Sequence, residues 1–156
     1  MPSRRQFRLE PVLRLRKQRE RERQGQLAVY LRQELEQRGL LNQMTENRST
    51  QLQLLSDQLN APRVEMTYVQ FGHAYLERLQ ALIERQSNVV RQATRATNQR
   101  RAELAQAVKE RKVIEKLREQ WWEALLEEDR QRDIKLLDEV ATVQFNQARQ
   151  AELQHA

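Results

Sequence analysis

The chain has 156 residues, of which 32% are charged and only 5% aromatic. So little apolar surface excludes the core of a globular domain of this length and favours a coiled coil, in which each helix buries only a seam. The absence of cysteine excludes disulfides and thiolate metal sites and fits a reducing compartment. No apolar run approaches the roughly 18 residues of a membrane helix, and no apolar segment follows the N-terminal arginines as in a secretory signal. We therefore expect a cytoplasmic protein.

The formal net charge of +6 is concentrated at one end of the chain. Residues 1–23, the basic pole, contain nine basic and three acidic side chains, whereas the other 133 residues contain 19 of each. Such a pole attracts nucleic acid, anionic lipid or an acidic protein surface. The alternative is a solvated helical face without a partner. The basic residues are Arg4, Arg5, Arg8, Arg14, Arg16, Lys17, Arg19, Arg21 and Arg23.

The first predicted helix covers residues 9–59 and follows an arm, residues 1–8. Pro11 is tolerated only in a first helical turn, which sets the start of this helix. Asn60-Ala61-Pro62 ends it, because proline lacks an N–H group and disfavours helical geometry in the residue before it. Residues 60–67 are the predicted turn. The predicted seam of this helix consists of Leu13, Leu27, Leu31, Leu41, Leu52, Leu55 and Leu59.

The second predicted helix covers residues 68–150 and is followed by a frayed tail, residues 151–156. No glycine or proline occurs from His73 to the end of the chain, and apolar residues recur at steps of three and four, which predicts one stripe on a helix. The stripe consists of Leu76, Leu79, Ile83, Val90, Ala93, Leu104, Ala107 and Ile114.

Two long helices joined by so short a turn fold back on each other as an antiparallel hairpin. With the turn centred near Arg63, residue i faces residue 127 − i, so that Leu55 lies beside Gly72. The first residues of helix 1, the predicted helix 9–59, then lie opposite Arg118 of helix 2, the predicted helix 68–150. We therefore predict an all-α fold: one long two-helix antiparallel coiled-coil hairpin, residues 1–156, in which helix 2 overhangs helix 1.

The predicted overhang is rich in apolar side chains that helix 1 cannot cover. Exposed patches of this kind mark interaction sites. Either the arm folds over part of it, with Phe7 near Trp121, or two chains pair there. We expect the arm to cover some of the patch and a partner protein to cover the rest. The apolar residues are Trp121, Trp122, Leu125, Leu126, Ile134, Leu136, Leu137, Val140, Val143 and Phe145.

The sequence offers little for catalysis or cofactor binding. The two histidines, His73 and His155, are too far apart on one rod to share a metal ion, and no zinc motif accompanies them. An acidic cluster on a solvated helix, residues 127–133, has no cleft in which to shift its pKa values for acid–base work. We therefore expect no enzymatic activity, no cofactor, no metal and no small-molecule substrate.

Four motifs, in order along nearly the whole chain, resemble the FliJ family of flagellar type III export proteins. The first is Phe7-Arg8-Leu9-Glu10-Pro11-Val12-Leu13-Arg14-Leu15-Arg16. The second is Tyr68-Val69-Gln70-Phe71 with Leu76-Glu77-Arg78-Leu79. The third is Glu110-Arg111-Lys112-Val113-Ile114-Glu115-Lys116-Leu117, and the fourth is Leu137-Asp138-Glu139-Val140-Ala141.

The resemblance implies a non-enzymatic central stalk that enters a hexameric export ATPase ring, links it to the transmembrane export-gate subunit and handles empty export chaperones. Such a protein is cytoplasmic and reaches the inner membrane only peripherally, through its partners. The terminal end of the rod is then the ring-binding end, with Arg14, Arg16, Arg19, Trp121, Trp122, Leu125 and Leu126. The gate-facing surface is Tyr68, Phe71, Tyr75 and Leu76, for which ordinary seam packing is the alternative.

Two other functions compete with this one. The equivalent stalk of a virulence secretion system has the same physical features, and neighbouring genes would separate the two. A basic region followed by leucines is also typical of a dimeric DNA-binding zipper. However, Pro11 interrupts the basic segment, and the fold-back at Pro62 replaces parallel pairing, which argues against nucleic acid as a partner.

Overall fold

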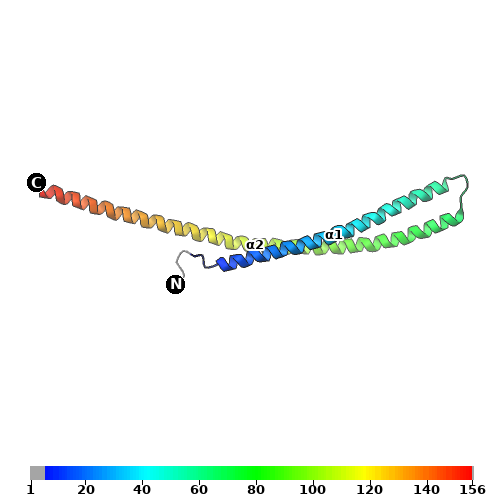
Figure 1. Cartoon of the computed structure of the whole chain (residues 1–156), viewed down its shortest axis with the longest axis horizontal. Coiled ribbons are helices and arrows are strands. Elements are labelled where there is room, and N and C mark those ends of the chain that lie inside the picture. Colours follow the sequence, from blue (N-terminus) through cyan, green and yellow to red (C-terminus); the bar gives the residue numbers. More distant parts are fainter. Residues whose placement is uncertain (1–5, 156) are drawn as a thin grey trace. The chain divides into compact units, whose positions relative to one another are not determined.

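The computed structural model describes residues 6–155 and contains two helices (Figure 1). Helix α1 is Glu10–Leu59, with 50 residues, and helix α2 is Met66–Gln154, with 89 residues. The described residues form no strand, so the predicted all-α hairpin is confirmed. Contacts divide the chain into two compact units. The hairpin unit is Gln18–Val108, and the terminal unit is formed by the described parts of Met1–Lys17 and Lys109–Ala156.

The helix ends follow from local hydrogen bonds. After α1, the Asn60 amide donates to the Ser56 carbonyl at 3.1 Å, and Pro62 follows two residues later. Helix α2 begins two residues before the predicted start, because the Glu65 carbonyl already accepts the Val69 amide at 3.2 Å. The predicted frayed tail is helical through Gln154. Residues 1–5 of the predicted arm, with Arg4 and Arg5 of the basic pole, and Ala156 lie outside the described residues.

In the hairpin unit the predicted stripe of α2 lies at the seam between the helices. Leu79 and Ala107 are buried, and the other predicted members in this unit are half-buried. The predicted seam of α1 is partly wrong: Leu31, Leu52 and Leu59 are 39%, 46% and 50% exposed. The seam of α1 instead follows a seven-residue repeat through a charged residue. Its covered members are Leu27, Glu34, Leu41 and Leu55, whereas Arg48, at the remaining position of this repeat, is exposed.

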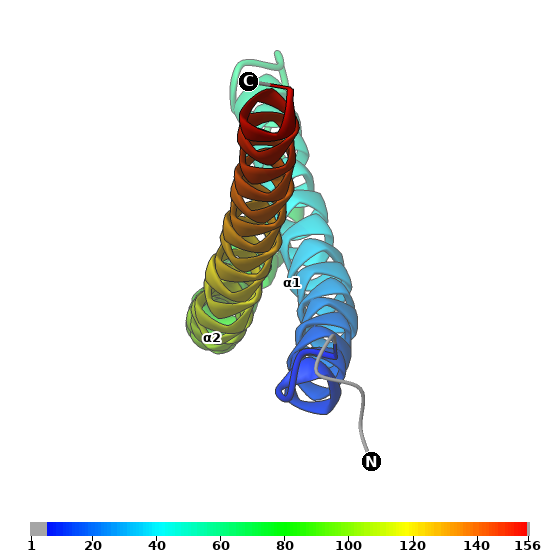
Figure 2. The same ribbon diagram turned by 90° about the vertical axis from the view of Figure 1, so that its left-hand side faces the viewer.

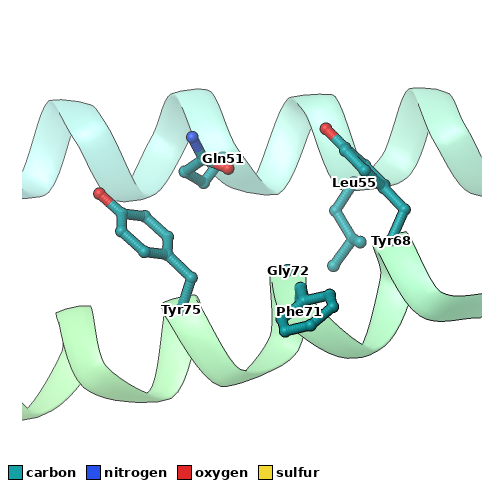
Figure 3. Close-up of a pocket in the computed structure, with 6 residues that line it drawn as sticks. All are labelled: Gln51, Leu55, Tyr68, Phe71, Gly72 and Tyr75. Atoms are coloured by element: carbon teal, nitrogen blue, oxygen red, sulfur yellow. The ribbon is translucent and has the colours of Figure 1, made fainter.

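The predicted register is confirmed in the hairpin unit. A Cβ atom at Gly72 would lie 3.0 Å from the Leu55 Cδ1 atom, so Leu55 packs into the space that this glycine leaves (Figure 3). The Thr97 hydroxyl lies 3.4 Å from the Tyr30 carbonyl oxygen, again a pair whose numbers add to 127. The predicted register therefore holds at both of these points in the unit.

In the terminal unit the start of α1 packs on α2, with Leu13 only 1% exposed. Arg16 pairs with Glu110, and the Nε atom of Arg118 lies 3.3 Å from the Glu10 carboxylate. Helix α1 thus begins opposite Arg118, as predicted. Beyond the contact of Phe7 with Trp121, α2 continues with no other described segment of the unit beside it (Figures 1 and 2), and every residue from 131 to 155 is exposed.

Candidate protein-binding sites

The first candidate site is an open groove of about 920 Å³ where the arm meets α2 in the terminal unit. The Phe7 carbonyl accepts the Glu10 amide at 3.2 Å, and this turn places the Phe7 ring on Trp121, with 5.8 Å between the ring centroids. Trp122 lies another 5.8 Å from Trp121 and is 53% exposed. The predicted contact of the arm with Trp121 is confirmed, and the neighbouring Trp122 stays more than half exposed.

The walls of this groove are charged, with three arginines and two glutamates. Arg8 and Arg14 are exposed, whereas Arg118 is held by Glu10. The groove therefore combines aromatic side chains with the exposed guanidinium groups of Arg8 and Arg14. An acidic protein surface with an apolar side chain at its centre would fit this combination.

The structure brings together only some of the predicted ring-binding residues. Arg14, Trp121 and Trp122 line the same groove. Leu125 is half-buried and Leu126 is 54% exposed, one turn further along α2. Arg16 lies in the seam with Glu110, and Arg19 is an exposed residue of the hairpin unit.

The unpartnered end of α2 has an amphipathic face. From Ile134 to Ala148 the large apolar residues fall within about half of the helix circumference, at 100° per residue, and Asp138, Glu139 and Asn146 lie on the other half. The apolar residues are 43–68% exposed: Ile134, Leu136, Leu137, Val140, Val143 and Phe145. Such a face on a charged helix is suited to contact with another protein.

Three of the four predicted gate-facing residues, Tyr68, Phe71 and Tyr75, border a second, smaller cavity of about 240 Å³ next to the turn of the hairpin unit. Figure 3 shows Tyr68 and Tyr75 extending from α2 towards α1, and Leu55 extending from α1 towards α2. Tyr68, Phe71 and Tyr75 are 46%, 73% and 45% exposed. Leu76 is half-buried in the seam, which favours ordinary packing for this residue.

A polar cluster in the middle of the hairpin unit was missed by the sequence reasoning. Glu34 is 8% exposed and Thr97 is fully buried. The Glu34 carboxylate accepts hydrogen bonds from Arg38 at 2.8 Å and from the Thr94 hydroxyl at 2.9 Å. The seven-residue repeat between Leu27 and Leu41 was the signal that places residue 34 in the seam.

These bonds make the hairpin unit sensitive to acid. The hydrogen bond from Arg38, then that from Thr94, holds the pKa of Glu34 below its ordinary value of 4.5, although burial opposes this shift. Because its pKa is lower in the folded than in the unfolded protein, the ionised Glu34 carboxylate stabilises the fold at pH values above the unfolded pKa. This stabilisation is lost as the pH falls through the folded pKa.

We expect Glu34→Gln to be less stable than wild type at pH 7, and we expect this difference in stability to shrink below about pH 4.5. Urea unfolding followed by circular dichroism at pH 7 and pH 3 measures both. If the stability difference between wild type and Glu34→Gln is the same at pH 7 and pH 3, the lowered pKa of Glu34 is wrong.

No sign of metal binding or membrane spanning was found in the described part of the chain. Residues 6–155 contain no group of three or more His, Cys, Asp or Glu side chains that could hold a metal ion. Within the same range neither helix is apolar over enough of its length to cross a bilayer.

Together, the fold and its surfaces define a coiled-coil hairpin whose exposed aromatic and aliphatic patches are suited to protein contacts. The chain matches the family model described as Flagellar FliJ protein over residues 5–150, and it therefore belongs to the FliJ family. Membership gives it a role related to flagellar type III export, in association with components of the export apparatus. It also indicates a non-catalytic component. No curated protein and no solved structure matches the chain.

Proposed function

We propose that this protein is the central stalk of the flagellar export ATPase. Its terminal unit contacts the hexameric ATPase ring, and the turn of its hairpin unit contacts the transmembrane export-gate subunit. It also handles empty export chaperones and stays at the cytoplasmic face of the inner membrane through these partners. The observation that carries the proposal is the unpartnered end of α2, where exposed apolar residues follow the Trp121–Trp122 groove.

The family match and the physical features of the chain support the same proposal. The matched family is flagellar, which favours the flagellar stalk over the equivalent stalk of a virulence system. The hairpin is antiparallel, with Leu55 against Gly72, whereas a DNA-binding zipper needs parallel helices that leave its basic regions free. A stalk needs no active site, and it needs apolar contact surfaces at its ends.

Replacing Trp121 and Trp122 by serine tests the ring contact. We expect the variant to need an about tenfold higher concentration to stimulate ATP hydrolysis by the purified export ATPase, because tryptophans in grooves dominate binding energies. The matched control is Val29→Ser with Leu35→Ser, which removes two apolar side chains that are 55% and 72% exposed in the hairpin unit. The proposal is wrong about this site if both variants stimulate the ATPase equally.

A further inference from the structure

Six charged side chains form one stripe on the part of α2 that belongs to the terminal unit. They follow one another at steps of three or four residues, so they lie on one face of the helix, and all six are exposed. The first three are lysines and the last three are glutamates, so the charge of this face changes sign at its midpoint. The charge stripe is Lys109, Lys112, Lys116, Glu119, Glu123 and Glu127.

The charge stripe faces away from α1. At 100° per residue, Lys112 and Lys116 each lie about 160° around α2 from Ile114, a half-buried residue that the register places opposite Leu13. Within residues 6–155 no carboxylate forms an ion pair with any of the three lysines. Helix α1 therefore leaves this face open to another molecule.

Within a single chain the order of these charges is unfavourable. Lys112 and Lys116 are four residues apart, and so are Glu119 and Glu123. Like charges at this spacing are neighbours on the helix surface and destabilise it. A second set of charges in the reverse order, placed beside the stripe, would relieve both repulsions.

The charge stripe is complementary to itself in the antiparallel direction. Reversal of the helix about its midpoint, near residue 118, exchanges every lysine of the stripe with a glutamate. A two-fold axis between two copies produces this reversal, because the same surface of both copies then meets. Parallel copies would instead place lysine beside lysine and glutamate beside glutamate. The exchanged pairs are Lys109 with Glu127, Lys112 with Glu123, and Lys116 with Glu119.

One flank of the charge stripe adds apolar side chains to this contact. In an antiparallel pair, residues that directly follow stripe positions on one helix lie next to those that follow them on the other. Val113 and Leu117 each follow a lysine and are 59% and 41% exposed, and the exposed Ala124 follows Glu123. The same reversal places Leu117 beside Leu117 of the second copy and Val113 beside Ala124. The contact therefore has an apolar flank along its ion pairs.

We propose that this protein forms a two-fold dimer in which the charge stripes of two copies pair in antiparallel orientation. The stripe extends over 18 residues of rise, about 27 Å, and the two copies form six ion pairs across it. Exposed ion pairs are individually weak and are screened by salt. The dimer is therefore reversible, and its affinity falls as the ionic strength rises.

The position of the charge stripe gives the dimer a consequence for ring binding. Trp122 and Leu126, which we propose contact the ATPase ring, directly precede Glu123 and Glu127 of the stripe. A ring bound at these residues therefore competes with the second copy, and the dimer is a form of the protein outside the ring. The dimer itself does not depend on the proposed ring contact, which the ATPase titration of the tryptophan variant tests separately.

Charge-exchange variants of the full chain test the dimer. Lys112→Glu with Lys116→Glu, and separately Glu119→Lys with Glu123→Lys, place like charges opposite each other when either variant pairs with itself. A mixture of the two double variants brings opposite charges together again, and so does one chain with all four changes. All four residues are exposed, and circular dichroism verifies that each variant remains helical.

The matched control is Arg91→Glu with Arg95→Glu in the hairpin unit. These residues are exposed and four positions apart, so the control has the same change of net charge at the same spacing as the lysine variant. Sedimentation equilibrium at low and high salt measures the dissociation constant of the dimer for every protein.

At low salt we expect wild type, the control and the fourfold variant to dimerise with dissociation constants within about twofold of each other. Each double variant alone should dimerise at least about tenfold more weakly, their mixture should recover the wild-type affinity, and high salt should weaken every dimer. A wild type that stays monomeric up to its solubility limit would overturn the inference, and so would double variants that dimerise like wild type. A monomeric fourfold variant would also overturn it, because that chain keeps the antiparallel complementarity.

Discussion

Leu55→Asp should lower the free energy of unfolding of the hairpin unit by about 3–5 kcal/mol, because it leaves a charge in the seam without a partner. Leu55 is 6% exposed, and its Cδ1 atom occupies the space beside Gly72. A carboxylate there would lose most of its hydration, because α2 covers nearly all of this side chain. Urea unfolding followed by circular dichroism measures the loss.

Two controls isolate burial as the cause of this effect. Leu54→Asp changes the neighbouring residue, which is 45% exposed, and Leu126→Asp changes a residue that is 54% exposed on the unpartnered end of α2. A carboxylate remains hydrated at both positions, so each should cost about 1 kcal/mol or less. If Leu126→Asp costs the isolated protein as much as Leu55→Asp, the end of α2 is packed in solution, and the interpretation of that face as a free surface is wrong.

The two helices differ in how far their seams follow from the sequence. On α2 the seam residues are themselves apolar at most positions, so the steps of three and four between Leu76 and Ile114 define the stripe directly. On α1 the repeat alternates Leu27, Glu34 and Leu41, and a search for leucines therefore selects residues beside the seam. A buried glutamate is compatible with a seam only because Arg38, one turn later on α1, and Thr94 of α2 satisfy it, and Thr94 reaches it only when both helices are in place.

The candidate sites, like the seams, could be predicted from the sequence only in part. The contact between Phe7 and Trp121 fits the register, since their numbers add to 128, close to the predicted 127, and the turn from Phe7 to Glu10 carries the pairing into the arm. Arg16 was grouped with the surface arginines because the basic pole is uniform in composition. It lies one turn after Leu13 in the seam repeat, where Glu110 pairs with it. Charge alone does not separate an arginine that positions a helix from one that is free to bind a partner, whereas its place in the repeat does.

Deletion of all residues after Gln120 should abolish stimulation of the export ATPase while leaving the hairpin unit folded. The deletion removes both tryptophans and the whole amphipathic face, and residues 131–155 are exposed throughout, so their loss takes little buried surface from the fold. The arm loses the partner of Phe7, which loosens the first turn of α1 and leaves the contact of Leu55 with Gly72 in place. Circular dichroism and urea unfolding verify the hairpin, and ATP hydrolysis by the purified export ATPase, titrated with each protein, measures the function.

A shorter deletion, of residues 149–156, is the matched control, because it leaves the apolar residues from Ile134 to Phe145 in place. This protein should stimulate the ATPase like wild type, since the proposed contact surface is intact. If the chain that ends at Gln120 is folded and stimulates the ATPase as well as wild type, the ring does not bind this end of α2. The exposed apolar face would then serve dimerisation or another partner. Sedimentation separates these two: loss of a dimer on deletion indicates self-association, and a monomer in both proteins indicates another partner.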